Sequence, residues 1–410
     1  MSEETGIIRS LIDQDLYKFT MQQGVVELFQ REWVKYNFIN RGKTNFPDGF
    51  DLRLRQEIKK MEKLSLTGRE YTFLNHKCGH FLKPTYVDFL KSYQYDGSEI
   101  GITQNGGDLT VTIEGYWYRT ILWEVPLMAL ISELYFEMTG EKINPRPDRK
   151  LNNTNKGKSF YTNGMKVADF GTRRRYSYDN QLEVVTDMLD CFDNGTPFLV
   201  GTSNVHIAMT LDITPIGTHA HEWFMFHAVH YGYTMANTRG VENWVKVYQG
   251  DLGIALPDTF TVDVFFRTFD KKHAKLYDGL RHDSGDAFKF SDKVVAHYKK
   301  LGIDPKSKTI VFSDGLNTEL AIELHKYCEK IGIMCSFGIG THFTNDVGVK
   351  ALNMVIKIVQ VKVNGIWIDT VKLSDNPIKH TGTEAEIKLC KQTLRIPILE
   401  KQDDKKVAIV

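Results

Sequence analysis

The sequence has few cysteines, and they form no pattern that would build a framework. Its 410 residues include five cysteines, an odd number scattered without a C-x-x-C pair: Cys78, Cys191, Cys328, Cys335 and Cys390. Disulfide-rich domains and zinc ribbons need cysteines paired at short spacing, so the sequence argues against both classes. This usage is typical of a reducing compartment, and we expect a cytoplasmic protein.

A surplus of charge and a long apolar run are also missing. The formal net charge is +1, with 25% charged and 42% hydrophobic residues. That balance argues against a general nucleic-acid-binding or membrane-surface protein, although it leaves room for a local basic pocket. The apolar start, IIRSLIDQDLYKF, is interrupted by charges, so it predicts neither a signal peptide nor a membrane span. We therefore expect a globular protein of about two domains whose partners are small molecules.

The first part of the chain has the pattern of an α+β domain. Helical spacing of apolar residues is found at the N-terminus, around 51–65 and 84–94, and over an aromatic-rich stretch in which Pro126 should kink the helix. WVKYNFIN alternates as a strand does, and EIGITQNGGDLTVTIEG predicts a hairpin about an Asn-Gly-Gly turn. Residues 140–165 are polar and rich in Asn, Lys and Pro, which predicts a long surface connection.

From residue 165 short apolar segments alternate with amphipathic stretches. Seven such segments end in small or functional residues: VADFGT, FLVGTSN, ITPIGTH, FTVDVFF, YDGLRHDSG, TIVFSDG and CSFGIGT. This is the pattern of a parallel βα array, and seven units favour a closed or nearly closed barrel with its chemistry at the carboxyl ends of the strands. The tail, NMVIKIVQVKVNGIWIDTVKLS, predicts a second hairpin that rejoins the first domain.

The stretch GTHAHEWFMFHAVH, residues 217–230, is the centre of the functional prediction. A helix that begins near Ala220 places His221 and Glu222 in its first turn. Unpaired backbone N–H groups and the positive end of the helix dipole favour an anion there, so a phosphorylated side chain would be stabilised. Asp263 is a lone carboxylate in an apolar segment interpreted as a strand. We expect it to accept a hydrogen bond from His221 and to fix the imidazole tautomer.

Spacing alone leaves a metal site and a structural role open. His219 and His221 form an H-x-H pair such as metal-dependent hydrolases use. The H-E-x-x-H zinc pattern fails because Met225 stands where the second histidine should be. His227 and His230 lie among apolar residues, as in a packed helix.

Other segment ends favour phosphate and ribose. FGTRRRYS supplies Arg173, whose planar fork suits a carboxylate or phosphate, while Arg174 and Arg175 fit a solvated charge run equally well. Glycines in FGIGTHF allow backbone amides to approach phosphate oxygens. Carboxylates in RHDSGD and FSDG can hold ribose hydroxyls, or Mg²⁺ through water, although helix capping is as good an explanation for them.

Ten motifs together resemble the nicotinate phosphoribosyltransferase family. They are DQDLYKFTMQQ, ILWEVPLMALISE, DFGTRRR, GTSN, GTHAHEW, GLRHDSGD, VFSD, SFGIGT, LNMVIKIV and KLSD, in order and across nearly the whole chain. The resemblance implies an α/β fold with a distorted (β/α) barrel, over 141–355, beside an α/β sandwich made of 1–140 and 356–410. It implies a cytoplasmic enzyme of NAD salvage that joins nicotinate to phosphoribosyl pyrophosphate, coupled to ATP hydrolysis and assisted by Mg²⁺. It also implies a homodimer with shared sites.

The resemblance assigns roles to individual residues. It places the family's phosphorylated histidine at His221 and gives His219 no role. Asp263, from the burial argument above, and Glu222 are predicted as the catalytic residues beside it. Phe170 and Tyr17 sandwich the pyridine ring, with Tyr17 supplied by the other subunit. The remaining binding residues are Arg173 at the nicotinate carboxylate, Arg281 and Asp283 at the ribose and pyrophosphate, Asp314, Gly315, Gly338, Gly340 and Thr341 at the ribose 5-phosphate, and Lys357 and Lys372 as added positive charge.

Ser203, in GTSN, is the residue expected to select the acid. Nicotinamide-using relatives resemble this segment but carry an aspartate there, which accepts a hydrogen bond from the amide. A serine can donate a hydrogen bond to a carboxylate, whereas an aspartate would repel it. The resemblance therefore predicts an enzyme that takes nicotinate and rejects nicotinamide. A nucleotide sensor without catalysis on the same scaffold is the remaining alternative.

Overall fold

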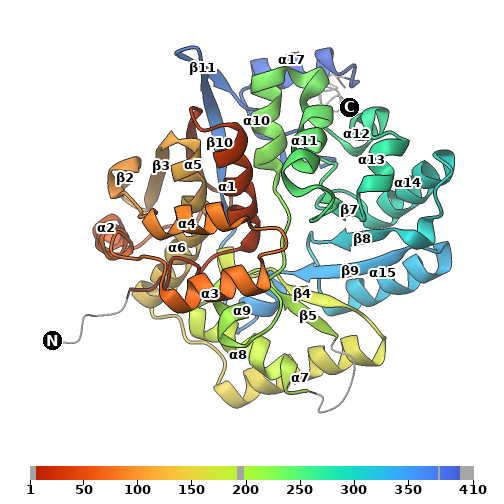
Figure 1. Cartoon of the computed structure of the whole chain (residues 1–410). Coiled ribbons are helices and arrows are strands. Elements are labelled where there is room, and N and C mark those ends of the chain that lie inside the picture. Colours follow the sequence, from red (N-terminus) through yellow and green to blue (C-terminus); the bar gives the residue numbers. More distant parts are fainter. Residues whose placement is uncertain (1–5, 192–197, 377–378, 398–410) are drawn as a thin grey trace, which may run out of the picture.

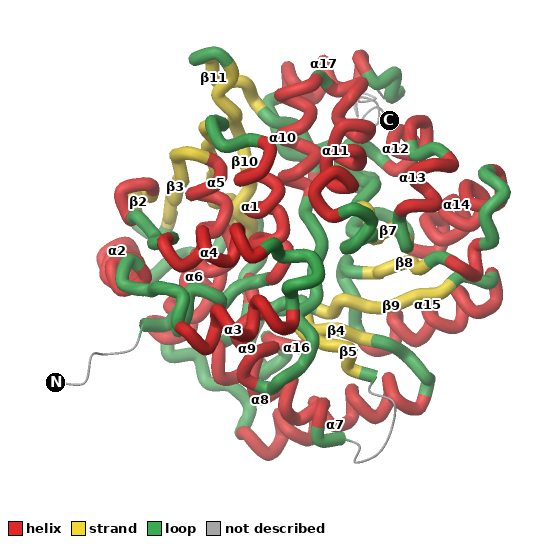
Figure 2. Tube along the Cα trace, in the orientation of Figure 1, coloured by secondary structure: helices red, strands yellow, loops and turns green. Residues whose placement is uncertain are grey.

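The computed structural model describes residues 6–191, 198–376 and 379–397. Its strands form two separate sheets (Figures 1 and 2). The first sheet has the order β11-β10-β1-β3-β2 and the second the order β5-β4-β9-β8-β7-β6. The strands are β1 (Trp33–Asn40), β2 (Ile100–Asn105), β3 (Asp108–Tyr116), β4 (Val167–Asp169), β5 (Leu199–Thr202), β6 (Ile254–Ala255), β7 (Gly279–His282), β8 (Thr309–Phe312), β9 (Met334–Ile339), β10 (Met354–Val363) and β11 (Ile366–Asp369).

The first sheet is antiparallel and combines both ends of the chain. β1 pairs with β10 from Trp33↔Lys362 to Asn40↔Met354, and on its other side with β3. Both predicted hairpins are present: β2 pairs with β3, and β10 with β11. Their turns place Gly106 (φ +54°) and Gly365 (φ +84°) in the left-handed region that glycine adopts without strain. The tail therefore rejoins the first part of the chain, as the alternating pattern predicted.

Helices cover this sheet where the spacing of apolar residues predicted most of them. α1 (Leu16–Leu28), α2 (Phe50–Met61) and α4 (Pro84–Ser92) were expected, whereas α3 (Gly68–Lys77), which begins with a capping box between Thr67 and Glu70, was not. The aromatic-rich stretch is divided into α5 (Trp117–Thr120), a short 3₁₀ turn, and α6 (Glu124–Thr139). Pro126 lies in the first turn of α6, where its missing N–H costs no helical hydrogen bond.

The polar connection predicted over 140–165 is wrong in its centre, because α7 (Arg146–Thr162) forms there. Prolines at its start suit a helix N-terminus. Its polar side chains are paired: Arg146 donates two hydrogen bonds to Asp187 of α8 (Tyr178–Leu189), at 2.9 and 2.7 Å, and Lys156 lies 2.5 Å from Asp346. Tertiary ion pairs thus stabilise a helix that has little apolar surface.

The second sheet is parallel and forms an irregular barrel. Of the seven segments predicted as strands, five are β4, β5, β7, β8 and β9. ITPIGTH makes only a bridge between Pro215 and Thr202, and FTVDVFF is a helix, α12 (Val262–Thr268), capped by the Thr261 side chain. β6 was not predicted. β5 and β6 are the two edges of the sheet and do not pair with each other, so the ring of strands stays open. This opening is the distortion of the barrel, and the expected α/β fold is confirmed.

Most of the remaining helices follow segments of this sheet: α9 (Val205–Thr210), α10 (His221–Tyr231), α11 (Tyr233–Tyr248), α13 (Lys271–Leu276), α14 (Ala287–Lys300), α15 (Thr318–Ile331) and α16 (Thr341–Thr344) (Figure 1). The last helix, α17 (Glu384–Thr393), follows β11 of the first sheet and contacts α11, while α10 also packs against β10. In the described part of the chain no helix has the length and apolar character needed to cross a membrane. The domain boundaries at 140/141 and 355/356 stay a prediction.

Candidate active site

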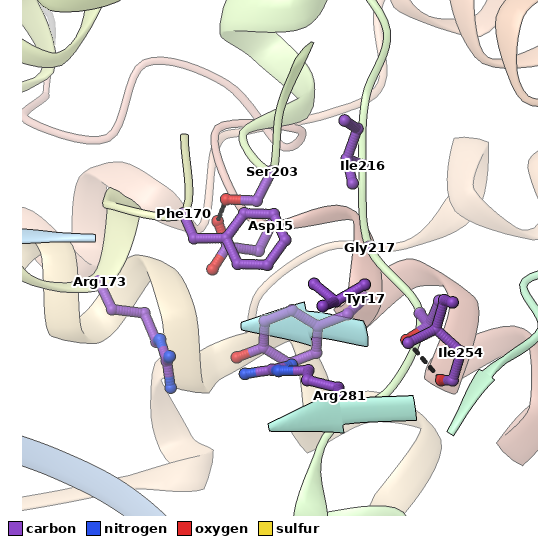
Figure 3. A pocket seen from close by; sticks show the side chains of 11 residues that line it. Asp15, Tyr17, Phe170, Arg173, Ser203, Ile216, Gly217, Ile254 and Arg281 are labelled. Carbon is purple, nitrogen blue, oxygen red and sulfur yellow. Dashed lines mark hydrogen bonds between the residues drawn. The ribbon is translucent and has the colours of Figure 1, made fainter. Parts of the chain in front are cut away.

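A pocket lies at the carboxyl ends of the parallel strands, beside the start of α1. Five predicted site residues line it together: Tyr17, Phe170, Arg173, Ser203 and Arg281. Figure 3 shows the rings of Phe170 and Tyr17 among the lining side chains, with Arg173 at one edge and Arg281 close to Tyr17. Ligands of parallel α/β folds bind at this end of the strands, so the arrangement is that of a small-molecule site.

Tyr17 belongs to the same chain as the rest of the pocket, so the expectation that the other subunit supplies it is wrong for this structure. The segment before α1 is attached to the barrel of its own chain. Leu16 N–H donates to the Ser203 carbonyl at 2.8 Å, and Asp15 bridges to Asn204. Gly217 permits the approach, since a Cβ there would lie 2.8 Å from the Tyr17 nitrogen. The sequence motif identified the ring but held no information about which chain would supply it.

Asp15 also lines the pocket, and the sequence interpretation missed it. Ser203 Oγ donates to Asp15 Oδ1 at 2.6 Å, so the serine hydroxyl is already used by a neighbour. Burial raises the pKa of the Asp15 carboxyl. Asp15 stands at the N-cap position of α1, but its side chain makes no capping hydrogen bond and faces the pocket instead.

Of the three consecutive arginines, Arg173 alone lines the pocket. Its Nη1 lies 3.6 Å from Glu124 Oε1. Arg175 is fully buried and pairs with Asp13 at 2.7 Å and Glu133 at 2.6 Å, which is a structural role. Burial and the neighbouring Arg173 lower the pKa of Arg174 to about 10. The solvated charge run considered for these two residues is wrong for Arg175, which is buried, while Arg174 is half-buried.

His221 is the first residue of α10, as predicted, with Ala220 at the N-cap. Its Nδ1 lies 3.0 Å from Thr259 Oγ1, and its Nε2 lies 3.0 Å from Asp283 Oδ2 and 3.5 Å from Asp258 Oδ1. Burial lowers the pKa of His221 to about 4. The imidazole is therefore neutral at pH 7, and one of its nitrogens keeps a lone pair.

The predicted partnership of His221 with Asp263 is wrong. Asp263 lies on α12, its side chain is 67% exposed, and it pairs with Lys293 at 2.8 Å. The segment FTVDVFF is a helix whose first turn buries Val262 and Val264 and leaves Asp263 exposed, so the carboxylate is not an isolated charge in a strand. Asp258 takes the expected place: it is buried, its Oδ2 accepts from Ser284, and its Oδ1 has no hydrogen-bond partner among the described residues.

Glu222 does not touch the pocket. Its carboxylate is buried and accepts from Tyr36 Oη at 2.5 Å and Trp117 Nε1 at 2.7 Å, while Lys18 Nζ lies 2.5 Å away. Both oxygens of the Glu222 carboxylate therefore have partners inside the protein. The structure thus gives Glu222 a positioning contact at the start of α10 in place of the catalytic role that we predicted.

Charged groups continue from His221 toward the loops after β7 and β8. Asp283 Oδ1 accepts from Arg281 at 3.0 Å and Ser313 at 2.9 Å. Burial alone would raise the pKa of Asp283, but Arg281 and His221 hold this pKa well below its ordinary value. Asp314 pairs at 2.5 Å with Lys379, which also donates to the Asp283 carbonyl at 3.1 Å. Lys379 was missed because it lies in a polar loop without a motif.

Two predicted lysines and one glycine have more specific surroundings than the sequence indicated. Lys372 is buried near Asp258 and Asp283, and burial lowers its pKa. Burial lowers the pKa of Lys357 to about 7. A Cβ at Gly338 would lie 2.3 Å from the Phe170 ring, so this glycine makes room for the aromatic wall of the pocket.

The other predicted loop residues lie where the strands end. Gly315 (φ +61°) follows Asp314 after β8, while Gly340 and Thr341 follow β9 and begin the short helix α16. Asp286, considered for the site, caps α14 instead, because its side chain accepts from Phe288 and Lys289 N–H. Of the two roles that the sequence left open, Asp283 has the contacts in the site and Asp286 has the helix cap.

The metal-capable cluster in the described residues is His221, Asp258 and Asp283, whose ligand atoms lie within 4.8 Å of one another. His219 is not part of it. His219 is buried, its ring is 4.7 Å from that of Trp244, and burial lowers its pKa to about 3. Neither of its ring nitrogens has a hydrogen-bond partner in the described residues. The geometry argues against the H-x-H zinc site of a hydrolase.

A ligand pocket at the carboxyl ends of parallel strands, beside a neutral histidine held by two carboxylates, defines the chain as an α/β-barrel enzyme. Two family models cover most of it: residues 165–398 match the nicotinate phosphoribosyltransferase (NAPRTase) family, and residues 12–132 match the NAPRTase N-terminal domain. The chain belongs to the nicotinate phosphoribosyltransferase family.

Relatives agree with this assignment over nearly the full length. The chain is similar to the nicotinate phosphoribosyltransferase of Desulforapulum autotrophicum, with 50% identity over 95% of this chain and 99% of that protein. It is 45% identical to the enzyme of Methanosarcina acetivorans, over 92% and 95%. Among solved structures, nicotinate phosphoribosyltransferase from Porphyromonas gingivalis has a TM-score of 0.91 at 42% identity, over 95% of this chain and all of that one. The enzyme from Vibrio cholerae has a TM-score of 0.87 at 32% identity, over 96% and 95%.

Proposed function

We propose that this enzyme joins nicotinate to phosphoribosyl pyrophosphate, giving nicotinate mononucleotide and pyrophosphate, in cytoplasmic NAD salvage. We further propose that ATP hydrolysis drives the reaction through a phosphohistidine at His221. The names of the relatives support the substrates. The observation that carries the proposal is the pocket that Phe170, Tyr17 and Arg173 line together, which combines aromatic rings with a guanidinium.

The pocket chemistry suits a flat aromatic acid. Aromatic side chains bind a ring by stacking, and Arg173 offers a fork for its carboxylate. Asp15 accepts the hydrogen bond that the Ser203 hydroxyl donates, and burial raises the pKa of the Asp15 carboxyl. Recognition of the nicotinate carboxylate is therefore assigned to the charge of Arg173. Nicotinamide would leave Arg173 without its anion.

The contacts of His221 select the nitrogen that reacts. Asp283 and Asp258 both face Nε2, so the proton is held there and Nδ1 keeps the lone pair. Nδ1 attacks the γ-phosphorus of ATP, a P–N bond forms, and ADP leaves with the electrons of the broken P–O bond. Thr259, which lies at Nδ1, must turn its hydroxyl away during this step. The product is stabilised by the unpaired N–H groups at the start of α10.

The acidic pair fits a Mg²⁺ ion. Asp258 Oδ1 is buried without a hydrogen-bond partner in the described residues, and carboxylate oxygens are the ligands that Mg²⁺ prefers. Asp258 and Asp283 would hold the ion, with His221 left free for phosphorylation because an imidazole is a poor ligand for it. Bound there, the ion would neutralise phosphate charge.

In the transfer step the pyridine nitrogen forms a bond to ribose C1 as the bond from C1 to pyrophosphate breaks. Positive charge develops on the ribose ring. The phosphohistidine contributes a charge of about −1.5 to −2 close to it. Arg281, Lys372 and Lys379 supply positive charge for the phosphates, and Asp314 is placed for a ribose hydroxyl.

Product analysis tests this function. The purified enzyme is incubated with phosphoribosyl pyrophosphate, Mg²⁺ and either nicotinate or nicotinamide, with and without ATP. We expect nicotinate mononucleotide and one pyrophosphate per product, faster with ATP, and at most traces from the amide. Equal use of acid and amide, or no mononucleotide with either, would refute the proposal.

A pair of aspartate variants tests the revised partner of His221. We expect Asp258→Asn to slow phosphorylation of the enzyme by ATP about tenfold or more, since a neutral amide no longer favours the proton on Nε2. Asp263→Asn, the matched change on exposed α12, should leave the rate unchanged. The measurement is the rate of phosphate incorporation from γ-labelled ATP. A slow Asp263→Asn enzyme beside a normal Asp258→Asn enzyme would reverse the assignment.

We also propose a homodimer, following the family resemblance, with a complete set of pocket side chains in each chain. Tyr17→Ala and His221→Ala are expected to be inactive separately. Mixing them should restore no activity even after subunit exchange, because Tyr17 and His221 lie in the site of one chain. Exchange is followed with two affinity tags. Recovered activity would mean that the subunits share these residues after all.

A further inference from the structure

Lys18 is a buried cation that the proposed chemistry does not use. Its side chain is 0% exposed and lies on α1, next to Tyr17 in the sequence. Its Nζ lies 2.6 Å from Glu124 Oε2 and 2.5 Å from Glu222 Oε2. Burial of a lysine disfavours its charge, but the two carboxylates more than compensate and raise the pKa of Lys18. The three side chains therefore form a buried group of two anions and one cation.

Glu124 connects this group to the pocket. While its Oε2 lies next to Lys18, its Oε1 faces Arg173 Nη1 at 3.6 Å. That separation is within the range of an ion pair but longer than a hydrogen bond, so Glu124 attracts the guanidinium without being hydrogen-bonded to it. Burial opposes ionisation of Glu124, yet Lys18, followed by Lys357 and Arg173, lowers its pKa to about 2. An ionised carboxylate thus stands beside the arginine that would receive the nicotinate carboxylate.

Glu222 fixes the other side of the group. Its second oxygen accepts from Tyr36 and Trp117, and it follows His221 directly at the start of α10. Glu222 cannot move toward Glu124 without losing those hydrogen bonds. The position of Lys18 is therefore defined from both sides, and its contact with Glu124 Oε2 holds that oxygen away from Arg173.

We propose that Lys18 is a positioning residue that keeps Arg173 available for the carboxylate of the substrate. By binding Glu124, Lys18 stops this carboxylate from closing on Arg173 as an internal substitute for the ligand. This inference rests on the proposed use of nicotinate and adds the group that sets its affinity. Without Lys18, Glu124 would be a buried anion with two cations left to attract it, Lys357 and Arg173, of which Arg173 lies within ion-pair distance. Buried charge without a close partner is costly enough to favour a closer contact with Arg173.

The test is a charge-compensation cycle. We expect Lys18→Met to raise the KM for nicotinate about tenfold or more, since neighbouring charges couple on this scale. The KM for phosphoribosyl pyrophosphate should change less than about twofold. The double variant Lys18→Met/Glu124→Gln removes the competing carboxylate as well, and its KM for nicotinate should return to within about threefold of the wild-type value.

Two further variants separate this effect from damage to the fold. Lys83→Met is the matched control, because Lys83 pairs with Glu27 at 2.7 Å on the surface, and it should have wild-type constants. Glu124→Gln alone should lower the KM for nicotinate, since Arg173 loses its neighbouring anion. A lower KM for nicotinate is not a result of misfolding, so the Glu124→Gln variant tests the inference even if Lys18→Met does not fold.

The outcomes distinguish this inference from the function on which it rests. If the wild-type enzyme makes no nicotinate mononucleotide, the proposed function fails first. If it does, and the double variant is as poor as Lys18→Met while Glu124→Gln also raises the KM, Lys18 has only a structural role and the inference is wrong.

Discussion

Replacement of His221 by alanine should abolish nicotinate-dependent ATP hydrolysis, with a decrease in kcat of about 10³-fold or more, as for loss of a covalent nucleophile. The expected cause is the loss of Nδ1, which keeps its lone pair because two carboxylates hold the proton on Nε2. Slow transfer of the phosphoribosyl group should persist without ATP coupling, since Phe170, Tyr17 and Arg173 are intact. The measurement compares ADP release with mononucleotide formation.

His227→Ala is the matched control for this change. His227 lies on the same helix and is equally buried, but its Nδ1 lies 2.6 Å from the Trp223 carbonyl and it has no place in the pocket. Thermal unfolding measures the stability of this variant, and its ADP release and mononucleotide formation should stay in the wild-type ratio. A His221→Ala enzyme with normal, coupled ATP hydrolysis would contradict the assignment.

Replacement of Arg173 by glutamine should reduce kcat/KM for nicotinate about 100-fold or more, which corresponds to a loss of about 2.7 kcal/mol. The glutamine keeps a donor but has no charge and no fork for the carboxylate. Because the amide substrate has no charge for Arg173 to bind, its poor rate should change far less, and the preference for the acid should narrow. Steady-state kinetics with both substrates give the two ratios.

Arg239→Gln serves as the control, since Arg239 pairs with Glu242 at 3.0 Å on an exposed helical face. Its constants should equal those of the wild-type enzyme. If Arg173→Gln reduced kcat/KM for nicotinate and nicotinamide by the same factor, Arg173 would act on a shared step and the proposed acid recognition would be wrong.

Local pattern was sufficient for those parts of the fold that local interactions determine. The Asn-Gly turn and its flanking alternation predicted β10 and β11, and the start of α10 at His221 followed from the glycine-rich turn before it. α7 could not be predicted in this way. Its polar residues resemble a loop until Arg146 and Lys156 meet Asp187 and Asp346, which come from elsewhere in the chain.

For the site, too, local motifs predicted some residues, whereas others are brought together only by tertiary structure. Motifs identified the pocket residues Tyr17, Phe170 and Arg173, since each stands next to a strand end or helix start. Asp263 was predicted because an aspartate within FTVDVFF suggested a buried strand, whereas the segment is a helix and Asp263 is exposed. Asp258 was not among the predicted residues. Only tertiary structure brings Asp258 to 3.5 Å from His221. The same holds for Lys18, whose carboxylate partners are distant in sequence.

The most direct test of the central claim is site-resolved mass spectrometry of the wild-type enzyme after incubation with ATP and Mg²⁺. The account predicts one acid-labile phosphate per chain, on His221, that disappears when nicotinate and phosphoribosyl pyrophosphate are added, with one nicotinate mononucleotide formed for each phosphate released. A stable enzyme that carries no phosphate under these conditions, or carries it on His219, would contradict the account.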